Sequence, residues 1–125
     1  MKNLYFIILL FVSSVSFSQE IHLGKTTAEI ASSTSYKTYN MVLNGKQSIC
    51  AIVDTNITDI YIFNMQGICI EYNRLISNIG FDTIEAYLSD YYNQGSVWVN
   101  NSKGLVAMVS QMSNRLYKIS IRKMY

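Results

Sequence analysis

The residues best suited to chemistry in this chain are one histidine, His22, and two cysteines, Cys50 and Cys69. A cysteine becomes a strong nucleophile when a histidine lies within hydrogen-bond reach and takes its proton. A metal site needs several converging ligands, and these three residues match no metal-binding spacing. His22 also stands in an N-terminal segment that we expect to be loosely held. The sequence therefore predicts no metal site and no cofactor.

Three interpretations of the two cysteines stay open: a reactive thiol, a disulfide, or ordinary strand residues. Export of the protein would favour a Cys50–Cys69 disulfide. If the intervening segment is a simple meander, however, the two cysteines lie two strands apart, at about 9–10 Å. A disulfide requires Cα atoms within about 7 Å of each other. Cys69 shares a side of its strand with Glu71 and Asn73, which predicts that it lies on the more polar face.

Carboxylates offer two pairs, Asp54 with Asp59 and Asp82 with Glu85. Such pairs can support general acid–base catalysis. The first pair flanks a predicted turn, where Asp commonly bonds to the local backbone, and the second has the spacing of a helix capping box. The sequence shows no nucleophile elbow, phosphate loop, dinucleotide fingerprint or calcium loop. We therefore expect that the protein is not an enzyme.

Aromatic side chains provide the other candidate chemistry, which is binding. Tyr and Trp are enriched at the hot spots of protein interfaces, and we take Tyr61, Phe63, Tyr92 and Trp98 as candidate binding residues. Tyr91 and Tyr92 cannot both face a core, because neighbouring helical residues point about 100° apart. Tyr92 is therefore expected to be exposed. The alternative is that these rings fill the core of a small domain.

The first residues have the layout of a secretory signal peptide. Lys2 gives a positive start, an apolar run covers residues 4–12, and small serines precede a cut before Gln19. The run is shorter than the about 20 apolar residues that cross a bilayer. We expect residues 1–18 to be removed and residues 19–125 to form one exported domain, periplasmic or secreted, without a membrane anchor.

The charge balance excludes one class of partner. The chain has 10 basic and 8 acidic residues, a formal net charge of +2. Nucleic acid binding would require a clear basic excess. The sequence therefore predicts no nucleic acid partner, and an envelope or secreted protein is the partner that we expect.

Two helices and six strands are predicted. Residues 26–34 open with a Thr–Glu capping box, and residues 82–93 open with an Asp–Glu pair at the same spacing. The second segment has one apolar stripe (Ile84, Tyr87, Leu88 and Tyr91), and Gly95 would end it. The strands are 48–54, 59–64 and 68–75 after the first helix, and 96–100, 105–110 and 116–122 after the second. In the last strand Tyr117, Ile119 and Ile121 alternate with Lys118, Ser120 and Arg122.

This order predicts an α+β fold of two helix-plus-three-strand units, with both helices packed on one face of an antiparallel sheet. The "GKTTAEI" opening, with strands and a second similar unit behind it, resembles the tandem α/β units of the β-lactamase-inhibitor-protein type. Outer-membrane assembly lipoproteins that share this half-unit open their helix with a similar Gly, Thr and acidic residue. Gly24, Thr26 and Glu29 match that opening, although the lipid-anchored cysteine of the lipoproteins has no counterpart here. The resemblance implies a small exported bacterial protein.

We therefore predict a small exported domain that acts as a non-catalytic protein-interaction module at the cell envelope. The alternative is a small thiol-dependent or hydrolytic enzyme that uses Cys69 or Cys50. That alternative requires His22 or a carboxylate within hydrogen-bond reach of the thiol.

Overall fold

The computed structural model describes residues 22–124, and the predicted signal peptide, residues 1–18, lies outside this range. The helices are α2 (Thr27–Ser33) and α3 (Phe81–Tyr87). The strands are β1 (Lys37–Leu43), β2 (Lys46–Asp54), β3 (Ile57–Phe63), β4 (Cys69–Ser77), β5 (Tyr92–Gln94), β6 (Val97–Asn100), β7 (Leu105–Ser113) and β8 (Leu116–Lys123). Within the described range neither helix has the length and apolar character needed to cross a membrane.

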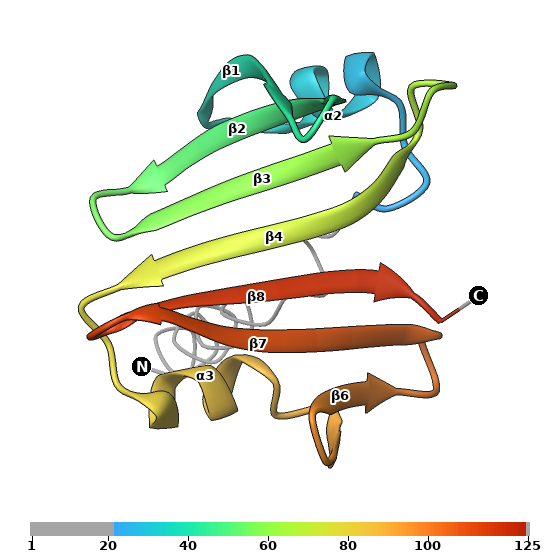
Figure 1. Cartoon of the computed structure of the whole chain (residues 1–125). Helices are drawn as coiled ribbons and strands as arrows, with labels where there is room; N and C mark the ends of the chain where they lie inside the picture. Colours follow the sequence, from blue (N-terminus) through green and yellow to red (C-terminus); the bar gives the residue numbers. More distant parts are fainter. Residues whose placement is uncertain (1–21, 125) are drawn as a thin grey trace, which may run out of the picture.

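The strands form one antiparallel sheet in the order β1-β2-β3-β4-β8-β7-β6-β5 (Figure 1). Strands β1 to β4 form one meander and β5 to β8 form another, and the two meet where β4 pairs with β8. The predicted α+β fold of two helix-plus-three-strand units is therefore wrong. A single eight-stranded sheet dominates the described chain, and its two helices have only seven residues each.

The predicted second helix accounts for part of this error. The segment 82–93 was expected to be helical throughout, but α3 ends at Tyr87, and Tyr92 begins the edge strand β5. Gly80 occupies the N-cap position and no side chain caps the helix. A turn over residues 88–91 and then backbone pairing of β5 with β6 thus replace the last helical turns. Gly95, which was expected to end the helix, has a φ of +72° and lies in the β5–β6 turn.

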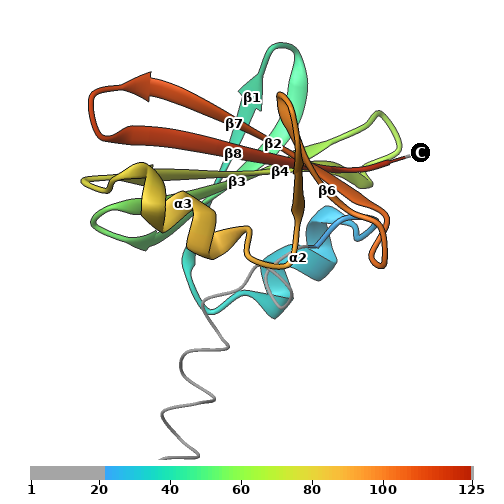
Figure 2. The same ribbon diagram turned by 90° about the horizontal axis from the view of Figure 1, so that it is seen from below.

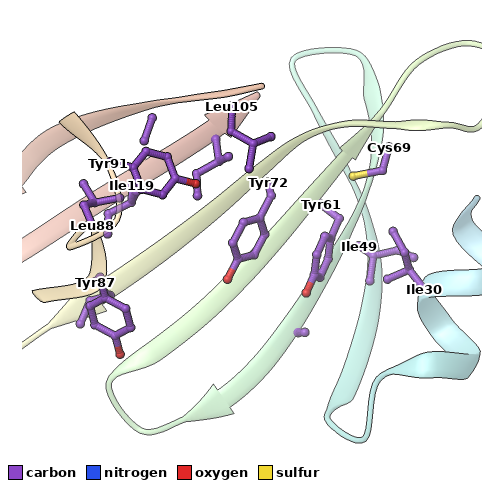
Figure 3. Packing of buried hydrophobic residues seen from close by; sticks show 14 of the residues in the cluster. Ile30, Ile49, Tyr61, Cys69, Tyr72, Tyr87, Leu88, Tyr91, Leu105 and Ile119 are labelled. Carbon is purple, nitrogen blue, oxygen red and sulfur yellow. The ribbon is translucent and has the colours of Figure 1, made fainter. Parts of the chain in front are cut away.

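The first helix begins as predicted. Thr26 Oγ1 accepts a hydrogen bond from the backbone N–H of Glu29 at 3.2 Å, and Glu29 Oε1 accepts one from the N–H of Thr26 at 3.0 Å. This capping box satisfies two donors that the first turn leaves unpaired. Ile30 is fully buried and lies beside Ile49 of β2 (Figure 3).

Both helices lie on the same side of the sheet (Figure 2), and we call this side the helix face. The core fills the space between the helices and the sheet (Figure 3). The predicted stripe of the second helix is buried there: Ile84, Tyr87, Leu88 and Tyr91. The last two of these residues lie beyond the end of α3. The sheet contributes Ile49, Tyr61, Phe63, Tyr72, Ile76, Ile119 and Ile121 to the same core.

The strand register assigns residues to the two faces, because directly opposite residues in an antiparallel pair point to the same side. Tyr61 lies opposite Tyr72 on the helix face. The neighbouring row of Ile60, Asn73 and Ser120 points to the other side, which we call the open face. The predicted alternation of the last strand is confirmed, since its apolar residues lie on the helix face.

The core contains one buried ion pair. Arg74 donates to Asp59 through Nε at 2.7 Å and through Nη2 at 2.8 Å. The two residues lie directly opposite each other on β4 and β3, and both are buried. The Arg74 guanidinium also lies 5.7 Å from the ring centroid of Tyr87, within cation–π range. Arg74 thereby connects the sheet to α3.

Candidate functional site

The two cysteines lie on opposite faces of the sheet. Cys50 of β2 is opposite Ile60 and points to the open face, whereas Cys69 of β4 is opposite Phe63 and is buried on the helix face. Both thiols are free, and β3 lies between their strands, so this geometry does not form the disulfide. Cys69 was expected on the more polar face. A β-bulge inserts Ile70 as an extra residue and turns Cys69 towards the core.

Burial makes Cys69 a poor nucleophile. Its Sγ lies 3.5 Å from the carbonyl oxygen of Glu71, and burial raises the pKa of the thiol to about 11. Burial and the nearby charge of Asp59 also raise the pKa of Cys50. A reactive cysteine needs a lowered pKa. Neither thiol therefore has the electrostatic surroundings that the enzyme alternative requires.

His22 packs against the core instead of lying loosely at the surface. Its ring centroid is 5.5 Å from that of Tyr61. Burial and the charge of Lys25 lower the pKa of His22, and the charge of Asp59 acts in the opposite direction. His22 Nδ1 is buried and has no hydrogen-bond partner among residues 22–124. The same range contains no group of three or more His, Cys, Asp or Glu side chains that could hold a metal.

The two predicted carboxylate pairs are held in other arrangements. Asp59 is bound by Arg74, whereas Asp54 accepts a local backbone hydrogen bond of 2.7 Å in the β2–β3 turn. Asp82 and Glu85 are exposed on α3, and neither caps it, so the capping-box prediction for this helix is wrong. Neither pair has the shared site that acid–base catalysis would need.

The four predicted binding residues separate into buried and accessible pairs. Tyr61 and Phe63 are 3% and 1% exposed and belong to the core, so they cannot contact a partner. Tyr92 is 68% exposed on the edge strand β5. Tyr92 pairs with Val99, which in turn lies opposite Val106 of β7. Since opposite residues share a face, this register places Tyr92 on the open face. Trp98 is half-buried on the helix face, where it lines a groove beside α3.

The open face combines exposed apolar side chains with cations, and neither helix covers it (Figure 2). Large hydrophobic residues that the register places there and that are exposed are Tyr39, Ile52, Tyr92 and Met108. The cations of this face are Lys37, Lys46, Lys118 and Arg122. Glu71 is the one acidic residue of the described strands that the register places there. The face therefore carries an excess of positive charge.

Acidic residues gather on the opposite side of the molecule. Glu29 lies on α2, Asp82 and Glu85 lie on α3, and Asp90 follows α3. The sequence has a net charge close to zero, but the fold distributes that charge unevenly. The overall composition consequently conceals a cationic face.

A polar network crosses the open face where the two meanders meet. Arg122 Nε lies 2.6 Å from Glu71 Oε1, and Asn73 Nδ2 donates to Glu71 Oε2 at 2.8 Å. Ser120 Oγ donates in turn to Asn73 Oδ1. These four residues come from β4 and β8, so the network joins one meander to the other.

Two adjoining hollows lie at one end of the open face. Their volumes are about 370 and 280 Å³, and both are lined by Lys46 and Ile70. Glu71, Arg122 and Lys123 line the larger hollow. Three cations and one carboxylate therefore surround a recess that is large enough for an acidic side chain.

Lys37 and Tyr39 were not among the predicted binding residues, because they lie on β1, a strand that was not predicted. A signal for this strand was available in Asn44-Gly45, since Asn-Gly between two strands is the strongest short hairpin signal. The two residues have φ values of 50° and 78°, and Leu43 pairs with Lys46 across them.

Comparisons with known proteins identify no relative. No family model matches the chain, and neither the curated proteins nor the solved structures contain a match to it. The resemblance to tandem α/β units of the β-lactamase-inhibitor-protein type thus stays a prediction.

Proposed function

We propose that this protein is a non-catalytic interaction module of the cell envelope or its surroundings, and that its open face binds an acidic segment of a partner protein. One observation carries the proposal: a sheet face that neither helix covers displays exposed apolar side chains among four cations. Exposed apolar patches with a polar surround are typical of interaction sites.

The apolar side chains supply the contact area. Tyr39 is 49% exposed, Met108 is 48% exposed and Tyr92 is 68% exposed. Tyr and Met are enriched at protein interfaces. These residues lie on β1, β7 and β5, so a partner that covers all three crosses both meanders and the polar network between them.

The cations determine which partner is favoured. Lys37, Lys46 and Lys118 form no salt bridge with residues 22–124, whereas Arg122 is paired with Glu71. Complementary charge accelerates association and excludes partners of the same sign. Carboxylates of a partner would therefore be attracted to these lysines, and the recess beside Lys46 offers a place for one of them.

The test is a selection of binders from a library of random peptides displayed on phage, with the purified protein as bait. We expect enrichment of peptides that combine Asp or Glu with apolar residues, and binding that weakens as salt is added. In the variant Lys37→Glu/Lys46→Glu, the Kd of the selected peptides should rise by at least about tenfold.

The matched control is Lys103→Glu/Arg115→Glu, which changes the net charge equally through two exposed cations in the β6–β7 and β7–β8 turns, neither of which lines the recess. This variant should bind the selected peptides as the unmodified protein does. Equal weakening by both variants would show a non-specific charge effect. Enrichment of basic or uncharged peptides, or binding to vesicles of anionic lipid without any peptide binding, would overturn the proposal.

A further inference from the structure

A third hollow lies on the helix face, away from the proposed interaction surface. It has a volume of about 520 Å³ and lies between the start of α3 and the β5–β6 hairpin, above β7 and β8. This volume is within the range of small-molecule sites, about 300–1,000 Å³. We call this recess the aromatic groove after three of its lining residues, Phe81, Trp98 and Tyr117.

The three aromatic rings come from three different elements. Phe81 begins α3, Trp98 lies on β6, and Tyr117 lies on β8. The ring centroids of Phe81 and Tyr117 are 6.2 Å apart and their planes are inclined by 54°. Trp98 and Tyr117 pack against the core, whereas Phe81 is 44% exposed. The groove thus has a fixed aromatic floor and one accessible ring at its edge.

Amide side chains supply the polar part of the groove. Asn93 and Gln111 line it, both are exposed, and neither side chain hydrogen-bonds to another residue of the described chain. Each amide offers two donors and one acceptor. Ser96 adds a hydroxyl group to the same lining. These groups can therefore form hydrogen bonds with a ligand that has both hydrogen-bond donors and acceptors.

None of the residues that line the groove is charged. A charged ligand would lose its hydration there without meeting a countercharge. A purely apolar ligand would bury the amides without partners, which also costs free energy. The ligand that matches this lining is neutral, has many hydroxyl groups and presents a C–H face to the rings, whose π-faces are negative. Sugars have this combination.

We propose that the aromatic groove binds a neutral saccharide, with its C–H face on the rings of Trp98 and Phe81 and its hydroxyl groups on Asn93 and Gln111. This inference is independent of the protein partner at the open face, because the two sites lie on opposite sides of the sheet.

The chain contains a single tryptophan, so the emission of Trp98 reports directly on this site. The full protein is titrated with neutral oligosaccharides of glucose, N-acetylglucosamine, mannose and xylose, and with acidic oligosaccharides of galacturonic acid. We expect a saturable change in Trp98 emission with at least one neutral oligosaccharide and none with the acidic ones. The Phe81→Ala and Gln111→Ala variants keep the reporter and should raise the Kd by about tenfold or more.

The control is Tyr92→Ala, which removes an exposed aromatic ring from the open face and should leave the titration unchanged. Circular dichroism of each variant establishes that the sheet is intact. If no neutral saccharide changes the emission at millimolar concentration, the proposal is wrong. Binding that is unaffected by Phe81→Ala and Gln111→Ala, or that is as strong for the acidic series, would overturn it as well.

Discussion

The buried ion pair Asp59–Arg74 permits a quantitative test of the core. The perturbation is Arg74→Met, which keeps much of the apolar volume of the side chain and removes its charge. Arg74 and Asp59 are joined by two hydrogen bonds of 2.7 and 2.8 Å, and their side chains are only 4% and 2% exposed. Since solvent cannot reach the carboxylate in the folded protein, Asp59 would be left buried without its partner.

Removal of one member of a buried ion pair typically costs about 3–5 kcal/mol. A domain of this size has a total stability of about 5–15 kcal/mol, so Arg74→Met should remove a large fraction of it. At about 4–8 °C per kcal/mol, the expected fall in Tm is at least about 12 °C. The double variant Asp59→Leu/Arg74→Met leaves no unpaired charge. It should therefore be more stable than Arg74→Met alone.

The assay is urea unfolding followed by circular dichroism and by tryptophan emission, with both single variants and the double variant in one cycle. The control is Lys103→Met, which breaks an exposed pair with Asp90 at 3.4 Å and should cost less than about 1 kcal/mol. The reasoning is refuted if Arg74→Met costs no more than Lys103→Met. It is also refuted if the cost of the double variant equals the sum of the two single costs, because the two charges would then be energetically independent.

Two further predictions concern a turn and a thiol. Gly45 has a φ of +78°, and an added Cβ would meet nothing within 4 Å. Gly45→Ala should therefore lower the free energy of unfolding by about 1–2 kcal/mol through backbone strain alone. Gly45→Asn should lower it less in the same urea assay, because Asn tolerates a positive φ better than Ala. The pKa of Cys69 is raised from 9.0 to about 11 in the folded protein, so between these pH values the unfolded chain releases a proton that the folded chain retains. The free energy of unfolding should fall by about 2–3 kcal/mol more over that interval than it does in Cys69→Ala, and equal slopes for the two proteins would contradict the assignment.

Local patterns were sufficient for most of the individual elements but not for their assembly into one sheet. The six predicted strands correspond to β2, β3, β4, β6, β7 and β8, and the capping box of Thr26 and Glu29 forms as expected. These features depend on residues close together in the sequence. Of the two missed strands, β1 had a local signal in Asn44-Gly45, whereas β5 depends on pairing with a neighbour. In particular, β5 has three exposed residues and no apolar stripe of its own, so pairing with β6 stabilises it as a strand.

The faces of the sheet were harder to predict because several strands are apolar on both sides. In β3, Tyr61 and Phe63 alternate with Ile60 and Ile62, so hydrophobicity alone does not distinguish the helix face from the open face. Asp59 is the informative residue, since a lone carboxylate in such a strand needs a cation opposite it. Arg74 lies at nearly the same distance from the intervening turn and could have been recognised as that partner. Tyr61 would then have been assigned to the same face as Asp59 and Arg74, but the burial of that face follows from the structure alone.

The same ambiguity gives the polar pairs a role in folding. A slip of one residue between strands would exchange the two faces, but a slip of two residues would keep every apolar side chain on its own side. Hydrophobic burial therefore opposes a slip of two residues only weakly. Such a slip would place Asp59 opposite Tyr72 or Ile76 instead of Arg74, and an unpaired buried charge is strongly unfavourable. At the β4–β8 junction the hydrogen bond between Asn73 and Ser120 favours the observed register over a slipped one in the same way. Polar pairs of the central strands thus select the register that makes the open face continuous across both meanders, which is the property that the proposed interaction surface requires.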